Sequence, residues 1–172
     1  MRLAPPLLLV CTLATLMPVQ AAELQIGPML FTLGAEQSAV MKVVESRFHI
    51  VSAAGQPDMF FLSEAKPPND RIVGAIAFEN GRFNMVQRQW ARFDGRVTST
   101  EVTKAIFAAL ESATAVSGSA ATLSTQVQRV PGVEFKSIHF DFPGRRVTIL
   151  AVDTDAKHQQ VNITESISTK QR

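Results

Sequence analysis

Three residues near the C-terminal end of the chain have side chains and a spacing that could bind a metal ion. Asp153, Asp155 and His158 follow one another as D-x-D-x-x-H, which would gather carboxylate oxygens and an imidazole nitrogen. Calcium would need more oxygen ligands and a glycine in the loop, and zinc would need further histidine or cysteine. Because neither is present locally, the competing interpretation is a polar turn between two strands. We assign no metal and no other cofactor.

The histidines and serines offer a second kind of chemistry, nucleophilic hydrolysis. A catalytic histidine must lie within hydrogen-bond reach of a nucleophile and be oriented by a third group. The chain has no G-x-S-x-G elbow, and no histidine lies close in sequence to Ser117 or Ser119. We therefore assign no catalytic residue. A small hydrolase stays as an alternative, in which folding would bring His49, His139 or His158 together with carboxylates in a concave pocket.

A cluster of arginines around the sole tryptophan points to binding. Arg88, Trp90 and Arg92 recur at every second position, so a regular strand would project all three from one face. A hairpin through Asn80 and Gly81 would add Arg71 opposite Trp90. Arginine and tryptophan are enriched at binding hot spots and attract each other through cation–π contacts. These four residues are the predicted binding site. The competing interpretation is an outer sheet face in which arginine stems simply cover the indole, and a bulge would scatter the patch.

The elements expected to position these residues begin with a helix over residues 35–49, whose apolar side chains recur at helical spacing. Strands are expected at residues 59–64, 72–79 and 82–93. Asn80-Gly81 is a strong hairpin signal, because a type I′ turn needs two positive φ angles. It predicts a register in which Phe78 opposes Phe83, Ile76 opposes Met85 and Val73 opposes Arg88. The first two pairs would share the core face, opposite to the arginine patch.

The second half of the chain repeats this order of elements. Thr98 and Glu101 form a capping-box pattern ahead of a helix over residues 98–114. Strands are expected at residues 122–130, 133–142, 145–152 and 159–167, with Pro-Gly turns between the first three. The sequence therefore predicts an α+β fold of two αβββ units, residues 24–95 and 98–167, which form an antiparallel sheet with two helices packed on one face. We interpret the repeat as an internal duplication in a single domain, residues 22–172.

The N-terminal 21 residues have the three parts of a secretory signal peptide. Met1 and Arg2 supply positive charge, residues 7–17 are apolar, and Pro18 precedes the small residues Val19 and Ala21. A retained membrane anchor is the alternative, but the apolar run is shorter than the roughly 20 residues that span a bilayer. We predict cleavage near Ala21 and a periplasmic or secreted protein without a stable membrane span.

Cleavage would also remove Cys11, the only cysteine, so the remaining chain could form no disulfide. The sequence has 17 Lys and Arg residues and 15 Asp and Glu residues, and the loss of Arg2 would leave an excess of one positive charge. A protein that binds nucleic acid through non-specific charge contacts normally has a larger basic excess. We therefore expect no nucleic-acid partner.

The run LGAEQSAVMKVVESRF, followed by a meander that contains IAFENGRF, resembles the small outer-membrane lipoproteins of the SmpA/OmlA type and the β-lactamase-inhibitory proteins. The resemblance covers about residues 24–93. It lacks a lipobox and the Gly-x-Pro that usually closes the first helix of those families. It implies paired αβββ units around one sheet, and a non-enzymatic protein that acts on another envelope protein through its sheet face or loops.

Together these observations predict a non-enzymatic protein that binds an envelope protein or an anionic envelope component through an exposed sheet face. The small hydrolase is one alternative. The other is a structural envelope subunit, in which an exposed strand at residues 159–167 pairs with another chain. The sequence does not determine the oligomeric state.

Overall fold

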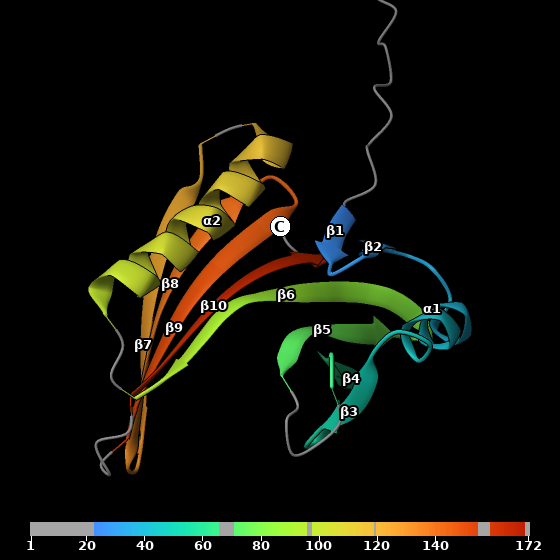
Figure 1. Ribbon diagram of the computed structural model, residues 1–172, viewed down its shortest axis with the longest axis horizontal. Coiled ribbons are helices and arrows are strands. Elements are labelled where there is room, and N and C mark those ends of the chain that lie inside the picture. Colours follow the sequence, from blue (N-terminus) through green and yellow to red (C-terminus); the bar gives the residue numbers. More distant parts are fainter. Residues whose placement is uncertain (1–22, 66–70, 96–97, 119, 155–158, 171–172) are drawn as a thin grey trace, which may run out of the picture.

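The computed structural model describes residues 23–65, 71–95, 98–118, 120–154 and 159–170 (Figure 1). The predicted signal peptide, with Cys11, lies outside the described residues, and so do Asp155 and His158. The first half of the described chain contains a short hairpin, one helix and four strands: β1 (Glu23–Ile26), β2 (Met29–Thr32), α1 (Gln37–Val44), β3 (His49–Ala53), β4 (Gln56–Ser63), β5 (Ile72–Glu79) and β6 (Arg82–Asp94). The second half contains one helix and four strands: α2 (Ser99–Ser117), β7 (Thr122–Val130), β8 (Val133–Phe142), β9 (Arg145–Thr154) and β10 (Gln159–Ser168).

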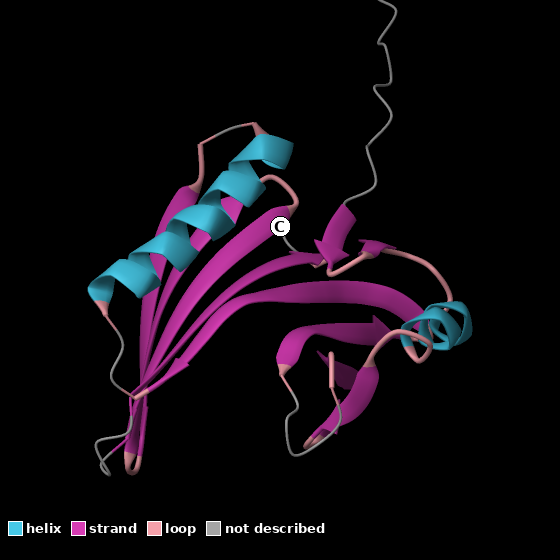
Figure 2. Cartoon of the chain, in the orientation of Figure 1, coloured by secondary structure: helices cyan, strands magenta, loops and turns pink. Residues whose placement is uncertain are grey.

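The strands form an eight-stranded antiparallel sheet in the order β3-β4-β5-β6-β10-β9-β8-β7, and β1 and β2 form a separate two-stranded sheet. Figure 2 shows the large sheet as a strongly curved layer with α2 lying across one side of it. The α+β class and the antiparallel sheet are confirmed. The expected αβββ order is wrong, because each helix is followed by four strands. The strand expected to be exposed, residues 159–167, corresponds to β10, which lies between β6 and β9 in the middle of the sheet.

The additional strand in the first half arises because α1 is shorter than expected. The helix ends at Val44, and residues 45–48 form a turn in which the amide of Phe48 still donates to the carbonyl of Val44. Val44 and Phe48 are both buried, so their spacing imitates a longer helix. The next residues, His49–Ala53, include β-branched side chains and pair with β4. Tertiary pairing therefore replaces the last helical turn with β3.

The hairpin between β5 and β6 has the predicted turn, and a bulge changes its register. Asn80 and Gly81 both have positive φ, 51° and 71°, and Phe78 pairs with Phe83 as expected. Beyond this pair, β6 contains one extra residue, so Ile76 faces Val86 and not Met85. The expected pairing of Val73 with Arg88 is wrong for the same reason, because Gly74 faces Arg88. The bulge therefore brings Arg88 to the same face as Phe83.

One face of the sheet, here called the helix face, carries the core. Near β5 and the start of β6, buried side chains pack beneath the β1–β2 hairpin and α1; this first cluster includes Ile26, Val44, Phe83 and Val86. The second cluster lies beneath α2 and includes Ala109, Ala113, Val147 and Ile163. In the part of the chain that the structure describes, no helix covers the other face, here called the open face, which is concave in Figure 1. The two helices therefore pack on the same side of the sheet, as predicted.

The predicted capping box at the start of α2 is confirmed. Thr98 Oγ1 accepts a hydrogen bond from the amide of Glu101, and Glu101 Oε2 accepts one from the amide of Thr98. These bonds to Thr98 favour the carboxylate and hold the pKa of Glu101 below its usual 4.5. Gly118 ends the helix in the left-handed conformation, with φ of 59°.

The capping box predicts a pH-dependent contribution to stability. Since the folded-state pKa of Glu101 is lower than the unfolded-state value, its stabilisation is present above pH 4.5 and is lost as the pH falls through the folded value. Glu101→Gln keeps a capping side chain but removes the titration. We expect wild type to lose more free energy of unfolding than Glu101→Gln between pH 6 and pH 3 in urea denaturation. Equal losses in the two proteins would contradict this role.

Candidate functional site

The four residues of the predicted binding site do not share one face. Arg88 and Trp90 lie on the helix face, where Arg88 donates to Ser112 Oγ of α2 at 2.8 Å and Trp90 packs against the second core cluster. Arg71 and Arg92 lie outside these contacts and line a hollow along the edge of β6, and Trp90 also lines that hollow. The predicted common face is therefore wrong. Two bulges in β6 cause this separation.

The second bulge lies at Trp90. Gln89 pairs with Thr164, and Ala91 pairs with Ile163. Because Thr164 and Ile163 are adjacent in β10, Trp90 is an extra residue of β6 in this pairing. Beyond Trp90 the side chains of β6 again alternate between the two faces of the sheet. Ala91 packs against the second core cluster on the helix face, and Arg92 lies on the other side. The first bulge thus turns Arg88 and Trp90 inward, and the second turns Arg92 away from them.

A buried carboxylate on β10 explains why an arginine and a tryptophan lie beneath a helix. Glu165 is fully buried and accepts hydrogen bonds from Arg88 Nη2 and Trp90 Nε1, both at 2.9 Å, and from Arg145 Nη1. Ser112 Oγ lies 3.5 Å from its other oxygen. The guanidinium carbon of Arg88 is 3.8 Å from the centre of the Trp90 ring, a cation–π distance. We call Glu165, Arg88, Arg145, Trp90 and Ser112 the Glu165 cluster.

Backbone carbonyls of β1 accept further hydrogen bonds from this cluster. Arg145 Nη2 donates to the carbonyl of Glu23 at 2.5 Å, and Arg88 Nη1 donates to that of Gln25 at 3.2 Å. Among the described residues, the buried Nε of Arg88 has no hydrogen-bond partner. The predicted binding residues Arg88 and Trp90 are thus engaged in structural contacts.

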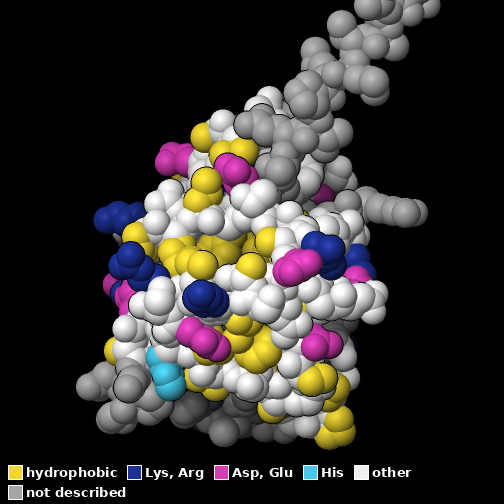
Figure 3. All heavy atoms as spheres, turned by 90° about the vertical axis from the view of Figure 1, so that its right-hand side faces the viewer, with side chains coloured by type: hydrophobic (Ala, Val, Ile, Leu, Met, Phe, Trp, Pro, Cys, Tyr) yellow, Lys and Arg dark blue, Asp and Glu magenta, His cyan; other side chains and the backbone are white. Residues whose placement is uncertain are grey.

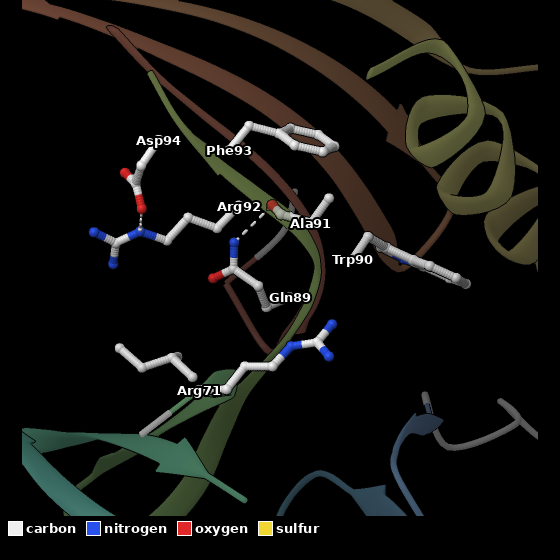
Figure 4. Close-up of a pocket in the computed structure, with 8 residues that line it drawn as sticks. Arg71, Gln89, Trp90, Ala91, Arg92, Phe93 and Asp94 are labelled. Carbon is white, nitrogen blue, oxygen red and sulfur yellow. Dashed lines mark hydrogen bonds and ion pairs between the residues drawn. The ribbon is translucent and has the colours of Figure 1, made fainter. Parts of the chain in front are cut away.

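Arg71 and Arg92 line a groove that runs along one edge of β6, and Trp90 also contributes to its wall. Arg71 and Arg92 border a hollow of about 660 Å³ whose wall runs along β6 from Gln89 to Asp94. A second hollow, of about 470 Å³, shares Gln89 and Arg92 with it and extends over the open face to β9 and β10. We call these adjoining hollows the β5–β6 groove. Figure 4 shows Arg92 turned toward Asp94, and Gln89 between Arg92 and Arg71.

The electrostatics of the groove are weakly positive. Arg92 Nε donates to Asp94 Oδ2 at 3.1 Å, which compensates one of the two cations. Within the described part of the chain, no carboxylate pairs with the exposed Arg71. Neutral amide and hydroxyl groups form most of the remaining polar lining; they belong to Gln87, Gln89, Thr148, Gln160, Asn162 and Thr164.

The groove exists because β5 and β6 separate. Their pairing ends at Gly74 and Arg88, so residues 89–94 of β6 pair only with β10. Among the described residues, one edge of this segment therefore faces the groove without a neighbouring strand. Gln89 partly satisfies this edge, since its Nε2 donates to the carbonyl of Ala91 at 2.8 Å. No local signal in the sequence predicts this separation, because residues 72–79 form a nearly continuous apolar run of the kind that an ordinary buried strand has.

His139 of β8 lies between two hydroxyl groups on the open face. Its Nε2 is 2.9 Å from Ser137 Oγ, and its Nδ1 is 3.0 Å from Thr148 Oγ1. An imidazole in this position could accept a proton from Ser137. Its other nitrogen, however, contacts the neutral hydroxyl of Thr148 and not a carboxylate. The neighbouring Asp141 pairs with Arg146 instead. Neither Ser137 nor His139 lines the β5–β6 groove, so the geometry assembles no hydrolytic site there.

Of the three residues of the predicted metal site, Asp153 is the one that lies within the described part of the chain. Asp153 Oδ2 accepts a hydrogen bond from Lys136 Nζ at 3.0 Å, and this bond, with Glu134 nearby, raises the pKa of Lys136. Among the described residues, no group of three or more His, Cys, Asp or Glu side chains could hold a metal ion.

Another apolar surface lies at the end of the molecule that carries α1. Leu30 and Val43, both more than half exposed, line a hollow of about 280 Å³ between β2 and α1. Figure 3 shows that end of the molecule, with apolar side chains in yellow among scattered charged groups.

Comparison of the chain with protein-family models, with curated proteins and with solved structures finds no match. In the described part of the chain, neither helix is long and apolar enough to cross a membrane.

The Glu165 cluster predicts a large stability effect. Glu165→Gln keeps the size of the side chain but leaves the buried Arg145 and the partly buried Arg88 without their counter-charge. We expect a loss of about 3 kcal/mol or more in the free energy of unfolding, the scale of a broken buried ion pair. Glu134→Gln, in an exposed pair with Arg129, is the matched control and should cost about 1 kcal/mol or less. Similar costs in urea denaturation would contradict the assigned role of Glu165.

Proposed function

We propose that this chain is a non-enzymatic binding protein and that its β5–β6 groove takes an extended, acidic segment of a cell-envelope protein. The observation that carries the proposal is the one-sided pairing of residues 89–94 beside Arg71 and Arg92. The proposal keeps the predicted kind of activity, and three of the four predicted residues, Arg71, Trp90 and Arg92, line the groove. It moves the contact surface from a regular sheet face to the groove between two strands.

The backbone of β6 supports an extended ligand. A strand with unpaired N–H and C=O groups can pair with an added segment, whose main-chain hydrogen bonds supply affinity. Residues 89–94 lie along the wall of the larger hollow, so an added segment would occupy the space between β6 and the start of β5. The neutral amides of Gln87 and Asn162 lie where side chains of the segment could bond.

The two arginines support an acidic ligand. Arg71 has an exposed guanidinium, and Arg92 shares its charge with only one carboxylate. Guanidinium groups bind carboxylates through paired, charge-assisted hydrogen bonds. A basic segment would instead face two like charges, so the same residues would also select against it.

The proposed setting rests on the N-terminal sequence. Its charged start, apolar run and small residues before Ala22 indicate export, which would place the groove in the periplasm or outside the cell. The resemblance to SmpA/OmlA-type and β-lactamase-inhibitory proteins is consistent with a role in binding another protein. We further infer an internal duplication, now of αββββ units, since α1 with β3–β6 and α2 with β7–β10 follow the same order.

A selection from a displayed library of random peptides tests the proposed function. We expect peptides enriched on the purified chain to contain several Asp or Glu residues and to shift the backbone amide NMR signals of residues 89–94. Arg71→Glu and Arg92→Glu should each weaken the selected peptides about tenfold or more, the scale of one lost charge-assisted bond.

Lys104→Glu is the matched control, because it makes the same change in charge at an exposed position on α2. It should leave the affinity of the peptides within about twofold at physiological salt, where charges farther apart than about 8 Å are screened. Neutral or basic peptides, or equal losses in all three variants, would contradict the proposed function.

A further inference from the structure

The strand β7 forms one edge of the large sheet and is exposed along its whole length. All nine residues of Thr122–Val130 are exposed, and β7 pairs only with β8. The other edge, β3, has five residues and belongs to the half of the sheet that carries the first core cluster. Short edge strands resist pairing with other chains, whereas long and flat ones invite it. Of the two edges, β7 is therefore the one open to another strand.

The features that normally protect an edge strand are missing from β7. Its pairing with β8 runs from Thr122 to Val130 without a bulge, and the strand contains no proline. Its single charged residue is Arg129, near one end, and Arg129 is paired with Glu134 of the same hairpin at 3.0 Å. The centre of the strand is therefore uncharged and regular, which favours pairing.

Large apolar side chains stand beside this edge. Leu123 and Val127 are 60% and 58% exposed, and Ile138 of β8 is 39% exposed. Leu123 pairs with Phe140, which packs in the second core cluster, so these three side chains lie on the helix face. The helix α2 packs mainly over β9, β10 and β6 and contacts β8 less, and it leaves Leu123, Val127 and Ile138 exposed.

The tight hairpin determines which backbone groups of β7 point outward. Val130 and Val133 flank the Pro131-Gly132 turn, so they form a hydrogen-bonded pair. Alternate residues then bond to β8, and the residues between them direct their N–H and C=O groups to the free edge. These outward-facing residues are Leu123, Thr125, Val127 and Arg129.

We propose that β7 pairs antiparallel with β7 of a second copy of this chain, about a two-fold axis at Thr125. In this register Thr125 faces its own counterpart and Leu123 faces Val127 of the other copy, which joins the exposed apolar side chains into one patch. On the open face, Ser124 would face Gln126. Arg129 would lie opposite Ala121, so no like charges meet.

The neighbouring register and the alternative geometries fit less well. An axis at Gln126 would place Leu123 opposite Arg129 and separate the apolar side chains. A two-fold contact of one strand with itself also closes the assembly at two copies, whereas pairing of β7 with a different edge would continue into a filament. The dimer would join two eight-stranded sheets and place both β5–β6 grooves on one continuous open face.

Sedimentation velocity tests the dimer. We expect the purified chain to form a dimer whose fraction increases with concentration. Thr125→Lys should shift it to monomer, because two lysines would meet at the axis. Thr125 is exposed, so the melting temperature of the monomeric variant should stay within about 2 °C of the value for wild-type monomer. A wild type that stays monomeric up to about 0.5 mM, or that forms larger oligomers, would overturn the proposal.

Cross-linking tests the register. Thr125→Cys and Gln126→Cys are compared in a Cys11→Ser background, which removes the only native cysteine. Paired residues on neighbouring antiparallel strands have Cα atoms about 5.5 Å apart, so a short thiol cross-linker should join Thr125→Cys copies. Gln126→Cys is the matched control, since each Gln126 faces Ser124 and the two cysteines lie farther apart. Equal cross-linking of both variants would overturn the assigned axis.

Discussion

The carboxylate of Glu165 is the constraint on which the rest of the structure depends. It is fully buried between Ile163, which belongs to the second core cluster, and Ile167, which belongs to the first. A buried carboxylate is stable only when hydrogen bonds and counter-charges surround it. Here Arg88 and Arg145 supply the charges, and a carbonyl of β1 accepts a further hydrogen bond from each of them. The cluster therefore links the two cores and holds the N-terminal strand against the sheet.

The same constraint divides the two faces of β6. To reach Glu165, Arg88 and Trp90 must lie on the helix face, and the bulge beyond Phe83 provides that change. The second bulge, at Trp90, brings Ala91 to the core side and leaves Arg92 beside the groove. One strand thus contributes an arginine to the interior and another to the proposed binding surface. A regular strand would place Arg88 and Arg92, which are four residues apart, on the same face.

The sequence predicts the elements whose signals are local. The Thr98–Glu101 capping box, the Asn80-Gly81 turn and the long second-half strands follow from residue types at fixed spacing, and the structure has all of them. The bulges in β6 leave no local signal, because they depend on the partner that each side chain finds across the sheet. Glu165 lies in a polar stretch that suggests exposure, so its burial and the inward turn of Arg88 are long-range effects. For this reason the sequence groups Arg71, Trp90 and Arg92, which line the same hollow, but does not place Arg88 against α2.

Gly74 shows how the inner packing produces the outer groove. A Cβ atom at Gly74 would lie 2.5 Å from the carbonyl oxygen of Gln87 and 2.6 Å from Cδ1 of Ile26, so Ile26 of β1 packs directly on the backbone of β5. Gly74 also forms the last pair with β6, opposite Arg88 of the Glu165 cluster. Beyond this point β6 continues with β10, and β5 turns away. The contacts that hold β1 on the helix face therefore lie at the position where the two strands separate, so the groove on the other side depends on the same packing.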